Sequence, residues 1–371
     1  MQAGTDTVRR PSGLALRNAA ASVAVVVLAS AAYAALPSSR AQLQQLHRLP
    51  GSAFTGGAFL VAAATAYSAA LIVWFLRTGG EGESKSLLFF AVLARWARRP
   101  RSIWHERLSQ ADRVAVLATL LKMFFGPLMV MSLMSFCMAA WANGQGIVAA
   151  TRAATAGAAP DLGLPVLREL FDRHGFWFLI QVILFVDVAI FTVGYLVEVP
   201  RLRNTIRSVD PTWLGWAAAL LCYPPFNSLT VRILGSQNAD FPRFDNPTVH
   251  LALNLLLLAL MAVYASASVA LGLKASNLTH RGIVARGPYA LVRHPAYVCK
   301  NLAWWIGALP LVSLAFEHSL FAGLQALASV LGWTLLYVLR ALTEEDHLRS
   351  VDAEYAAYAA RVRWRFVPGV V

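Results

Sequence analysis

Long apolar runs alternate with short polar or basic segments along most of the chain. Eight such runs lie at residues 18–36, 54–76, 114–142, 174–199, 212–224, 248–273, 297–316 and 319–339. A helix needs about 20 apolar residues to cross the hydrocarbon core of a membrane. The run at 212–224 is short by this measure, and the others are long enough. The pattern therefore predicts an all-α, polytopic membrane bundle of about eight transmembrane helices.

The composition supports a membrane protein and indicates its orientation. The chain is 58% hydrophobic and 14% charged, whereas soluble proteins carry about 25% charged residues. If eight spans alternate from a cytoplasmic N-terminus, 23 of the 32 Lys and Arg residues lie on the cytoplasmic side and 7 on the other. This asymmetry predicts an N-in, C-in protein of the inner membrane. We attribute the net charge of +13 to loops that face anionic membrane lipids, and we expect no nucleic-acid partner.

Two amphipathic segments lie outside the apolar runs. A basic and aromatic segment at about 85–108 predicts a helix in the cytoplasmic interface. Near the C-terminus, apolar residues recur at intervals of three and four, which predicts one helical face that docks on the cytoplasmic ends of the last three spans. These residues are Leu348, Val351, Tyr355, Tyr358 and Val362. The small residues at 143–162 predict a flexible linker.

The stretch RGPYALVRHPAY, residues 286–297, is the first candidate for chemistry. Its two prolines interrupt a helix, so it predicts a folded loop at the cytoplasmic mouth of the span that follows. This loop displays Tyr289, Arg293, His294 and Tyr297. An arginine fork suits a carboxylate or phosphate. The alternative is an anchor of tyrosine and arginine among the lipid headgroups.

The second candidate is the cluster Arg340, Glu344, Glu345 and Asp346, directly after the last span. Only the residues EH at 317–318 separate the last two spans, so these spans predict a hairpin that brings the cluster back to the loop at 286–297. Arg340 and Glu344 share a helix face and can pair with each other. Two acids that face an arginine and histidine loop can also hold a zwitterion, such as the methionine part of S-adenosylmethionine.

Together these motifs resemble those of the isoprenylcysteine carboxyl methyltransferase family, and more broadly those of phosphatidylethanolamine N-methyltransferases. The resemblance rests on R-G-P-Y-x-x-x-R-H-P-x-Y, the apolar hairpin, E-E, Y-x-x-Y and a final F-x-P, across about 275–371. It implies an S-adenosylmethionine pocket, a lipidic or prenylated acceptor and an active site that faces the cytoplasm. The cofactor-binding residues that it implies are Tyr289, Arg293, His294, Pro295, Tyr297, Glu344 and Glu345. It assigns catalytic roles to Arg340 and Glu345 and implies no metal.

The resemblance also divides the chain into two predicted domains. Residues 1–210 hold N-terminal spans of unassigned role, and residues 211–371 form a methyltransferase-like membrane domain. Many family members have a glycine soon after the motif tyrosine, whereas this chain has Cys299 and Lys300. Lys300 either reaches the interface or contacts the acceptor.

Two acids within the fourth run remain to be placed. We expect Asp187 to face the bundle interior, paired with Lys122 or Asn254, and we consider Glu198 a weaker acceptor-site candidate. Two other functions remain open for the whole chain. One is an NADPH-dependent sterol or isoprenoid reductase, because sterol reductases share a similar C-terminal half, and the other is a membrane scaffold or transporter.

Overall fold

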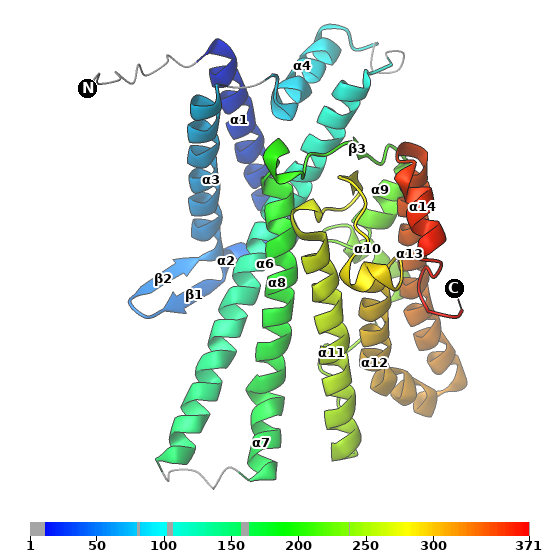
Figure 1. Ribbon diagram of the computed structural model, residues 1–371. Coiled ribbons are helices and arrows are strands. Elements are labelled where there is room, and N and C mark those ends of the chain that lie inside the picture. The colour runs from blue at the N-terminus through cyan, green and yellow to red at the C-terminus, as the bar shows by residue number, and fades with distance from the viewer. Residues whose placement is uncertain (1–11, 80–81, 102–106, 157–162, 237, 371) are drawn as a thin grey trace, which may run out of the picture. The chain divides into compact units, whose positions relative to one another are not determined.

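The computed structural model describes residues 12–79, 82–101, 107–156, 163–236 and 238–370. Helices make up 76% of it, so the all-α class is confirmed. Contacts divide the chain into a first unit, Met1–Met131, and a second unit, Ser132–Val371. The division falls within the long helix α6, Gln110–Thr155 (Figure 1). This helix continues to Thr155, so the first part of the predicted flexible linker at 143–162 is helical, and residues 157–162 lie outside the described chain.

The first unit contains two long apolar helices and a short hairpin. Helices α1 (Gly13–Ala35) and α3 (Gly56–Thr78) are connected through α2 (Arg40–Gln44) and the strands β1 (Leu46–Leu49) and β2 (Ser52–Thr55). Side chains cap both long helices: Ser12 Oγ accepts from Ala15 N, and Thr55 Oγ1 accepts from Ala58 N. These caps satisfy backbone donors that the first turn of a helix leaves unpaired.

The predicted interfacial helix is shorter than expected. Helix α4 spans Lys85–Arg98, because Pro100 forces the preceding residue out of helical geometry. Arg99 accordingly has an extended φ of −137°. Phe89 and Val92 are buried on one face, as an amphipathic helix requires. Of the predicted range, residues 102–106 lie outside the described chain.

The second unit holds the remaining helices. These are α7 (Leu164–Leu170), α8 (Phe176–Leu196), α9 (Trp213–Leu220), α10 (Asn227–Leu234), α11 (Pro247–Leu271), α12 (Pro295–His318), α13 (Leu320–Val351) and α14 (Glu354–Arg361). Two short strands, β3 (Ser208–Val209) and β4 (Thr279–His280), pair antiparallel. Helices α12 and α13 form the predicted hairpin, in which Ser319 caps α13 through Ala322 N.

Helices α8 and α11 lie side by side and run in the same direction (Figure 1). His250 at the start of α11 lies 3.3 Å from Asp172, which precedes α8. At their other ends, Ser208 pairs with His280. The chain must therefore return between 209 and 247, and it does so through the short helices α9 and α10.

The fifth predicted span is thus not a continuous helix. Helix α9 ends at Leu220, shortly before Pro224 and Pro225, and eight residues are too few to cross a hydrocarbon core. Within the described chain, seven helices are long and apolar enough to cross a membrane. The total of eight crossings and the N-in, C-in orientation stay predictions.

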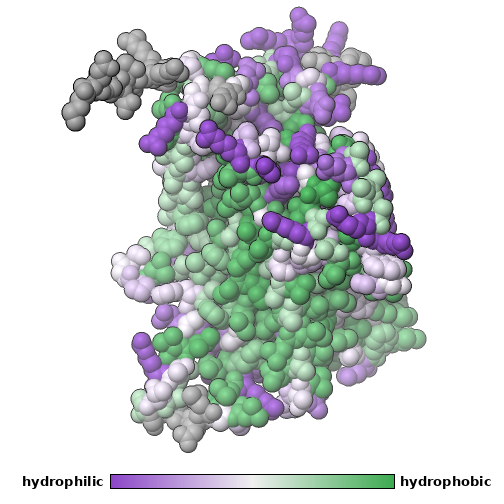
Figure 2. Space-filling view, in the orientation of Figure 1, coloured by the Kyte–Doolittle hydropathy of each residue, from purple (hydrophilic) through white to green (hydrophobic). Residues whose placement is uncertain are grey.

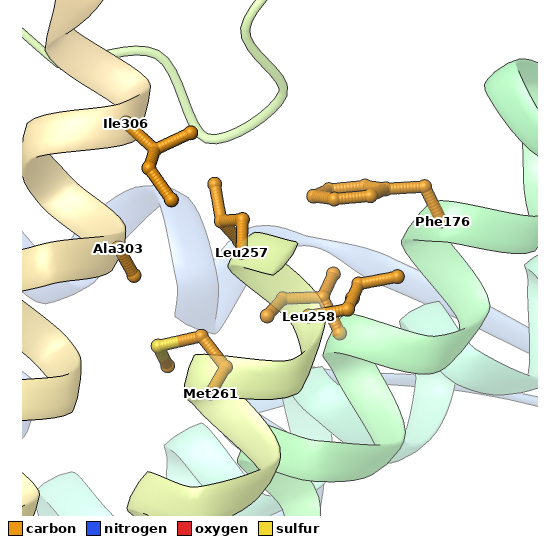
Figure 3. Packing of buried hydrophobic residues seen from close by; sticks show 7 residues of the cluster. Phe176, Leu257, Leu258, Met261, Ala303 and Ile306 are labelled. Atoms are coloured by element: carbon orange, nitrogen blue, oxygen red, sulfur yellow. The ribbon is translucent and has the colours of Figure 1, made fainter. Parts of the chain in front are cut away.

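Helices α8, α11 and α12 meet in an apolar core. Phe176 of α8 packs with Leu257, Leu258 and Met261 of α11, and Ile306 of α12 completes the cluster (Figure 3). This packing places α8 with the C-terminal helices in the second unit, and the domain boundary at 210/211 stays a prediction. Figure 2 shows hydrophobic surface along the middle of the long helices and hydrophilic residues near their ends, as a membrane protein requires.

Candidate functional site

Residues 286–294 form the loop that the two prolines predict. Gly287 has φ +58°, a conformation that favours glycine, and begins a short 3-10 turn over Gly287–Ala290. Arg286 Nε donates to the carbonyl of Ala270 at 3.1 Å and ties the loop to the end of α11. Pro295 then occupies the first turn of α12, where its missing N–H costs nothing.

The carboxylate of Glu345 contacts four basic side chains, two of which belong to this loop. Glu345 is fully buried. Its Oε1 accepts from Arg293 Nε at 2.9 Å and from Arg365 Nε at 3.1 Å, and it lies 3.1 Å from His294 Nε2. Its Oε2 accepts from Arg349 at 2.7 Å and from Arg365 at 3.1 Å. We call these five residues the Glu345 cluster. Their mutual contacts occupy both oxygens of the carboxylate.

The C-terminal segment closes over the same loop. Arg293 N donates to Trp364 O at 2.9 Å, and His294 N donates to Arg365 O at 3.0 Å. These two backbone bonds and the Arg365 side chain fix residues 364–365 against the loop. The loop is therefore bound to α13 through Glu345 and to the C-terminal segment through the two backbone hydrogen bonds.

Docking of the predicted C-terminal helix is confirmed in part. Tyr355, Tyr358 and Val362 are buried against Ile283 and Ala285. The predicted single face is interrupted, however, because α13 ends at Val351 with an extended residue after it. Val351 is consequently exposed and lies off the buried face.

Tyr358 connects α14 to the loop. Its hydroxyl donates to the carbonyl of Tyr289 at 2.9 Å. Burial raises the pKa of Tyr358 to about 12, and it also raises the pKa of Tyr289. Both phenols therefore stay neutral at physiological pH, and the Tyr358 hydroxyl acts as a hydrogen-bond donor.

One cavity lies between this loop and helices α8, α9, α11, α12 and α13, all in the second unit. Its lining includes five of the predicted site residues, namely Tyr289, His294, Tyr297, Arg340 and Glu344. The other three, Arg293, Pro295 and Glu345, are not among the lining residues of this described cavity. Arg293 and Glu345 contact each other instead in the Glu345 cluster, whose His294 is the member that also lines the cavity.

Arg340 projects into the cavity among aromatic rings. It donates to Asn277 Oδ1, and its guanidinium carbon lies 5.2 Å from the Tyr297 ring centre, 5.7 Å from that of Tyr223 and 5.8 Å from that of Tyr337. The expected alternative, a pair with Glu344, is not formed. Glu344 instead accepts from the Tyr297 hydroxyl at 2.8 Å. Cation–π contacts hold an arginine in place without neutralising its charge.

Lys300 is a second cation in the cavity lining. Its Nζ lies 5.2 Å from the Trp304 ring centre, 5.5 Å from that of Tyr337 and 5.7 Å from that of Tyr264. Tyr337 thus contacts both Lys300 and Arg340. The ammonium of Lys300 lies among these rings, and its contact with the acceptor stays a prediction.

Asp187 has different partners from those expected. It accepts from the Tyr264 hydroxyl at 2.7 Å and from Ser268 Oγ, both on α11. The expected partner Asn254 instead donates to the carbonyls of Pro242 and His250. Asp187 therefore stabilises the packing of α8 against α11 beside the cavity. Glu198 accepts from Ile206 N at 2.9 Å in the following loop and does not line the cavity.

Part of the cavity lining is polar and comes from loops that the motifs did not indicate. Asp210 follows β3, and Asn277 precedes β4. His347 of α13 also lines the cavity and contacts Ser208 Oγ at 3.1 Å. Pairing of β3 with β4 brings these segments together, and this pairing is too short to predict from sequence.

With this geometry established, the chain was compared with known proteins. Residues 226–362 match the family described as "Protein of unknown function (DUF1295)". This family is methyltransferase- and steroid reductase-like and resides in membranes. No curated protein and no solved structure matched the chain.

The matched region covers rather more than a third of the chain and contains the loop, the hairpin and the Glu345 carboxylate. It leaves out Asp187, Asp210 and Tyr223, although Asp210 and Tyr223 line the same cavity. The cavity is thus built from the matched region together with residues that precede it.

Proposed function

We propose that the protein is an S-adenosylmethionine-dependent methyltransferase of the membrane, with a lipidic or prenylated acceptor and an active site that faces the cytoplasm. The observation that supports this most directly is the cavity itself. Its lining combines the polar groups of Asp210, Glu344 and His347 with tyrosine rings, Lys300 and Arg340. Such a lining suits a polar donor beside the exposed Glu344 and an amphiphilic acceptor among the aromatic rings.

Glu344 and Tyr297 have the chemical groups that binding of the donor requires. Glu344 is exposed and lines the cavity, and its carboxylate accepts from the Tyr297 hydroxyl. Carboxylates and aromatic faces both attract a compact cation. When bound, the donor supplies a methyl group that is already activated on a sulfonium. The protein has to align the reacting atoms and exclude water.

Arg340 and the Glu345 cluster have distinct parts in this proposal. Arg340, fixed by Asn277 and three tyrosine rings, orients the polar group of the acceptor. Glu345 acts as a positioning residue, because both its oxygens bind the basic side chains behind the loop. Tyr289 and His294 line the donor side of the cavity.

Calorimetry with the purified full-length protein in detergent tests the proposal. We expect saturable binding of S-adenosylhomocysteine, weakened about tenfold in Glu344→Gln, which removes one charge-assisted contact. Asp346→Asn is the matched control, because the Asp346 side chain is 77% exposed and does not line the cavity. Binding of NADPH without binding of S-adenosylhomocysteine would overturn the proposal in favour of a reductase.

A further inference from the structure

Asp210 is a buried carboxylate with one oxygen left free. Asp210 is 1% exposed and is one of the residues that line the cavity. Oδ1 accepts from Thr212 N at 2.8 Å and from Thr212 Oγ1 at 2.7 Å. Oδ2 has no hydrogen-bond partner among the residues that the structure describes. A buried carboxylate oxygen without a partner costs free energy that a bound donor would recover.

The backbone around Asp210 is fixed on both sides. Its N–H donates to Leu278 O at 2.8 Å, and its carbonyl accepts from Trp216 Nε1 at 2.8 Å. Gly215 lets the carboxylate approach α9 closely, since a Cβ there would lie 2.0 Å from Oδ2. The position of the free oxygen is therefore set before any ligand binds, which lowers the entropic cost of binding.

The other charged groups that line the cavity lie on helices α12 and α13, and each contacts a residue other than Asp210. Lys300 and Arg340 are held among the tyrosine rings, and Glu344 accepts from Tyr297. His347 is bonded to Ser208. In the described chain, none of these side chains forms an ion pair with Asp210. Within the described chain, the charge of Asp210 thus has no ion-pair partner among these side chains, and its Oδ2 accepts no hydrogen bond from them.

We infer that Asp210 binds the α-ammonium group of the donor's amino-acid portion. An ammonium group supplies both the positive charge and the N–H donors that the free Oδ2 lacks. A divalent metal would need several oxygen ligands, whereas Asp210 offers a single free oxygen. This inference rests on the proposed function and extends it to a residue outside the matched family region.

The test compares ligands with and without the ammonium group. S-adenosylhomocysteine carries it, its deaminated analogue lacks only that group, and 5′-methylthioadenosine lacks the whole amino-acid portion. For the wild type, we expect the deaminated analogue to bind about tenfold more weakly than S-adenosylhomocysteine. In Asp210→Asn this difference should nearly vanish, while 5′-methylthioadenosine binds as it does to the wild type. Asp240→Asn, at an exposed loop position, is the control.

Each outcome of these binding measurements supports or contradicts the inference about Asp210. If Asp210→Asn weakens all three ligands equally, or none, Asp210 does not bind the ammonium and the inference is wrong. If the wild type binds no ligand, the proposed function itself fails. If Asp210→Asn does not fold, Trp216→Phe replaces it, since it removes only the indole donor to the Asp210 carbonyl. An unchanged preference for the ammonium ligand in Trp216→Phe then counts against the inference.

Discussion

At the scale of residues, Glu345 connects three parts of the second unit that are distant in sequence. It binds Arg293 of the loop, Arg349 of its own helix and Arg365 of the C-terminal segment. Loss of one partner from a buried ion pair leaves the others uncompensated and typically costs about 3–5 kcal/mol. We therefore expect Glu345→Gln to lower the thermal unfolding midpoint strongly in detergent.

The matched control for this prediction is the neighbouring acid. Asp346 is mostly exposed and lies 3.6 Å from Arg349, so Asp346→Asn should change the free energy of unfolding by about 0.5 kcal/mol or less. Equal midpoints for Glu345→Gln and the wild type would show that the Glu345 cluster does not stabilise the fold.

The helical repeat alone could have predicted that Glu344 and Glu345 point in different directions. Consecutive residues on a helix point in different directions, whereas Tyr337, Arg340 and Glu344 recur at intervals of three and four. Those three residues line the cavity, and Glu345 points away from it. Asp210 and Asn277 could not be placed in this way, because they lie in loops whose position depends on the β3–β4 pairing.

His280 gives the second unit a dependence on pH. Burial lowers its pKa below the ordinary value of about 6.5, and Asp352, 2.8 Å away, offsets part of this effect. The unfolded chain thus takes up a proton at pH values where the folded chain does not. Stability should fall as the pH decreases through about 6.5 toward the lower folded-state pKa. Unfolding midpoints between pH 7.5 and 5.5 measure this loss.

The corresponding variant is His280→Gln, for which we expect a flatter dependence of the unfolding midpoint on pH. His318→Gln, at the exposed end of α12, should keep the slope of the wild type. A slope that is the same in all three proteins would assign the pH dependence to other groups.

At the scale of elements, the long apolar runs were sufficient to predict the long helices. Their apolar side chains face other helices or lipid along their whole length, so composition alone identifies them. The fifth run was not predicted correctly, because its hydrophobicity conceals the turn before Pro224. The break in the C-terminal helix at Asp352 was also missed, since the apolar spacing continues across it.

The segment after α14 is the element that most directly supports the loop. Removal of residues 363–371 eliminates the Trp364 and Arg365 carbonyls that accept from Arg293 N and His294 N. We expect the amide hydrogens of residues 286–294 to exchange at least about tenfold faster in this truncated protein, because their local opening costs less free energy. Hydrogen exchange measured by mass spectrometry resolves this segment.

A shorter truncation provides the control for this measurement. Removal of residues 369–371 leaves both carbonyls and Arg365 in place, so the exchange of residues 286–294 should match the wild type. If the longer truncation also leaves exchange unchanged, the loop is stable without the C-terminal segment.

At the scale of the whole molecule, three segments predicted to be cytoplasmic gather at one end of the second unit. Arg207 N donates to His280 O, and Arg293 contacts Glu345, which joins 200–211, 274–296 and 340–371. Basic residues are concentrated in these segments, in agreement with the positive-inside rule. The return through α9 and α10 is what allows three such segments to share a side.

Labelling of introduced cysteines tests the predicted orientation. In a chain whose native cysteines are replaced, Leu291→Cys, at a position 71% exposed, should react with an impermeant thiol reagent only from the cytoplasmic side. His318→Cys, at the opposite end of α12, should react only from the other side. Labelling of both positions from the same side would contradict the predicted crossing of α12.

The bonds between residues 293–294 and 364–365 also bear on the order of assembly during synthesis. Arg293 and His294 leave the ribosome about seventy residues before the carbonyls that their N–H groups bind. Membrane helices α8 to α13 precede residues 364–365 in the chain and can be inserted first, whereas the loop gains these two backbone bonds only when residues 364–365 are available. The loop beside the cavity therefore reaches its final conformation later than the helices that surround it are inserted.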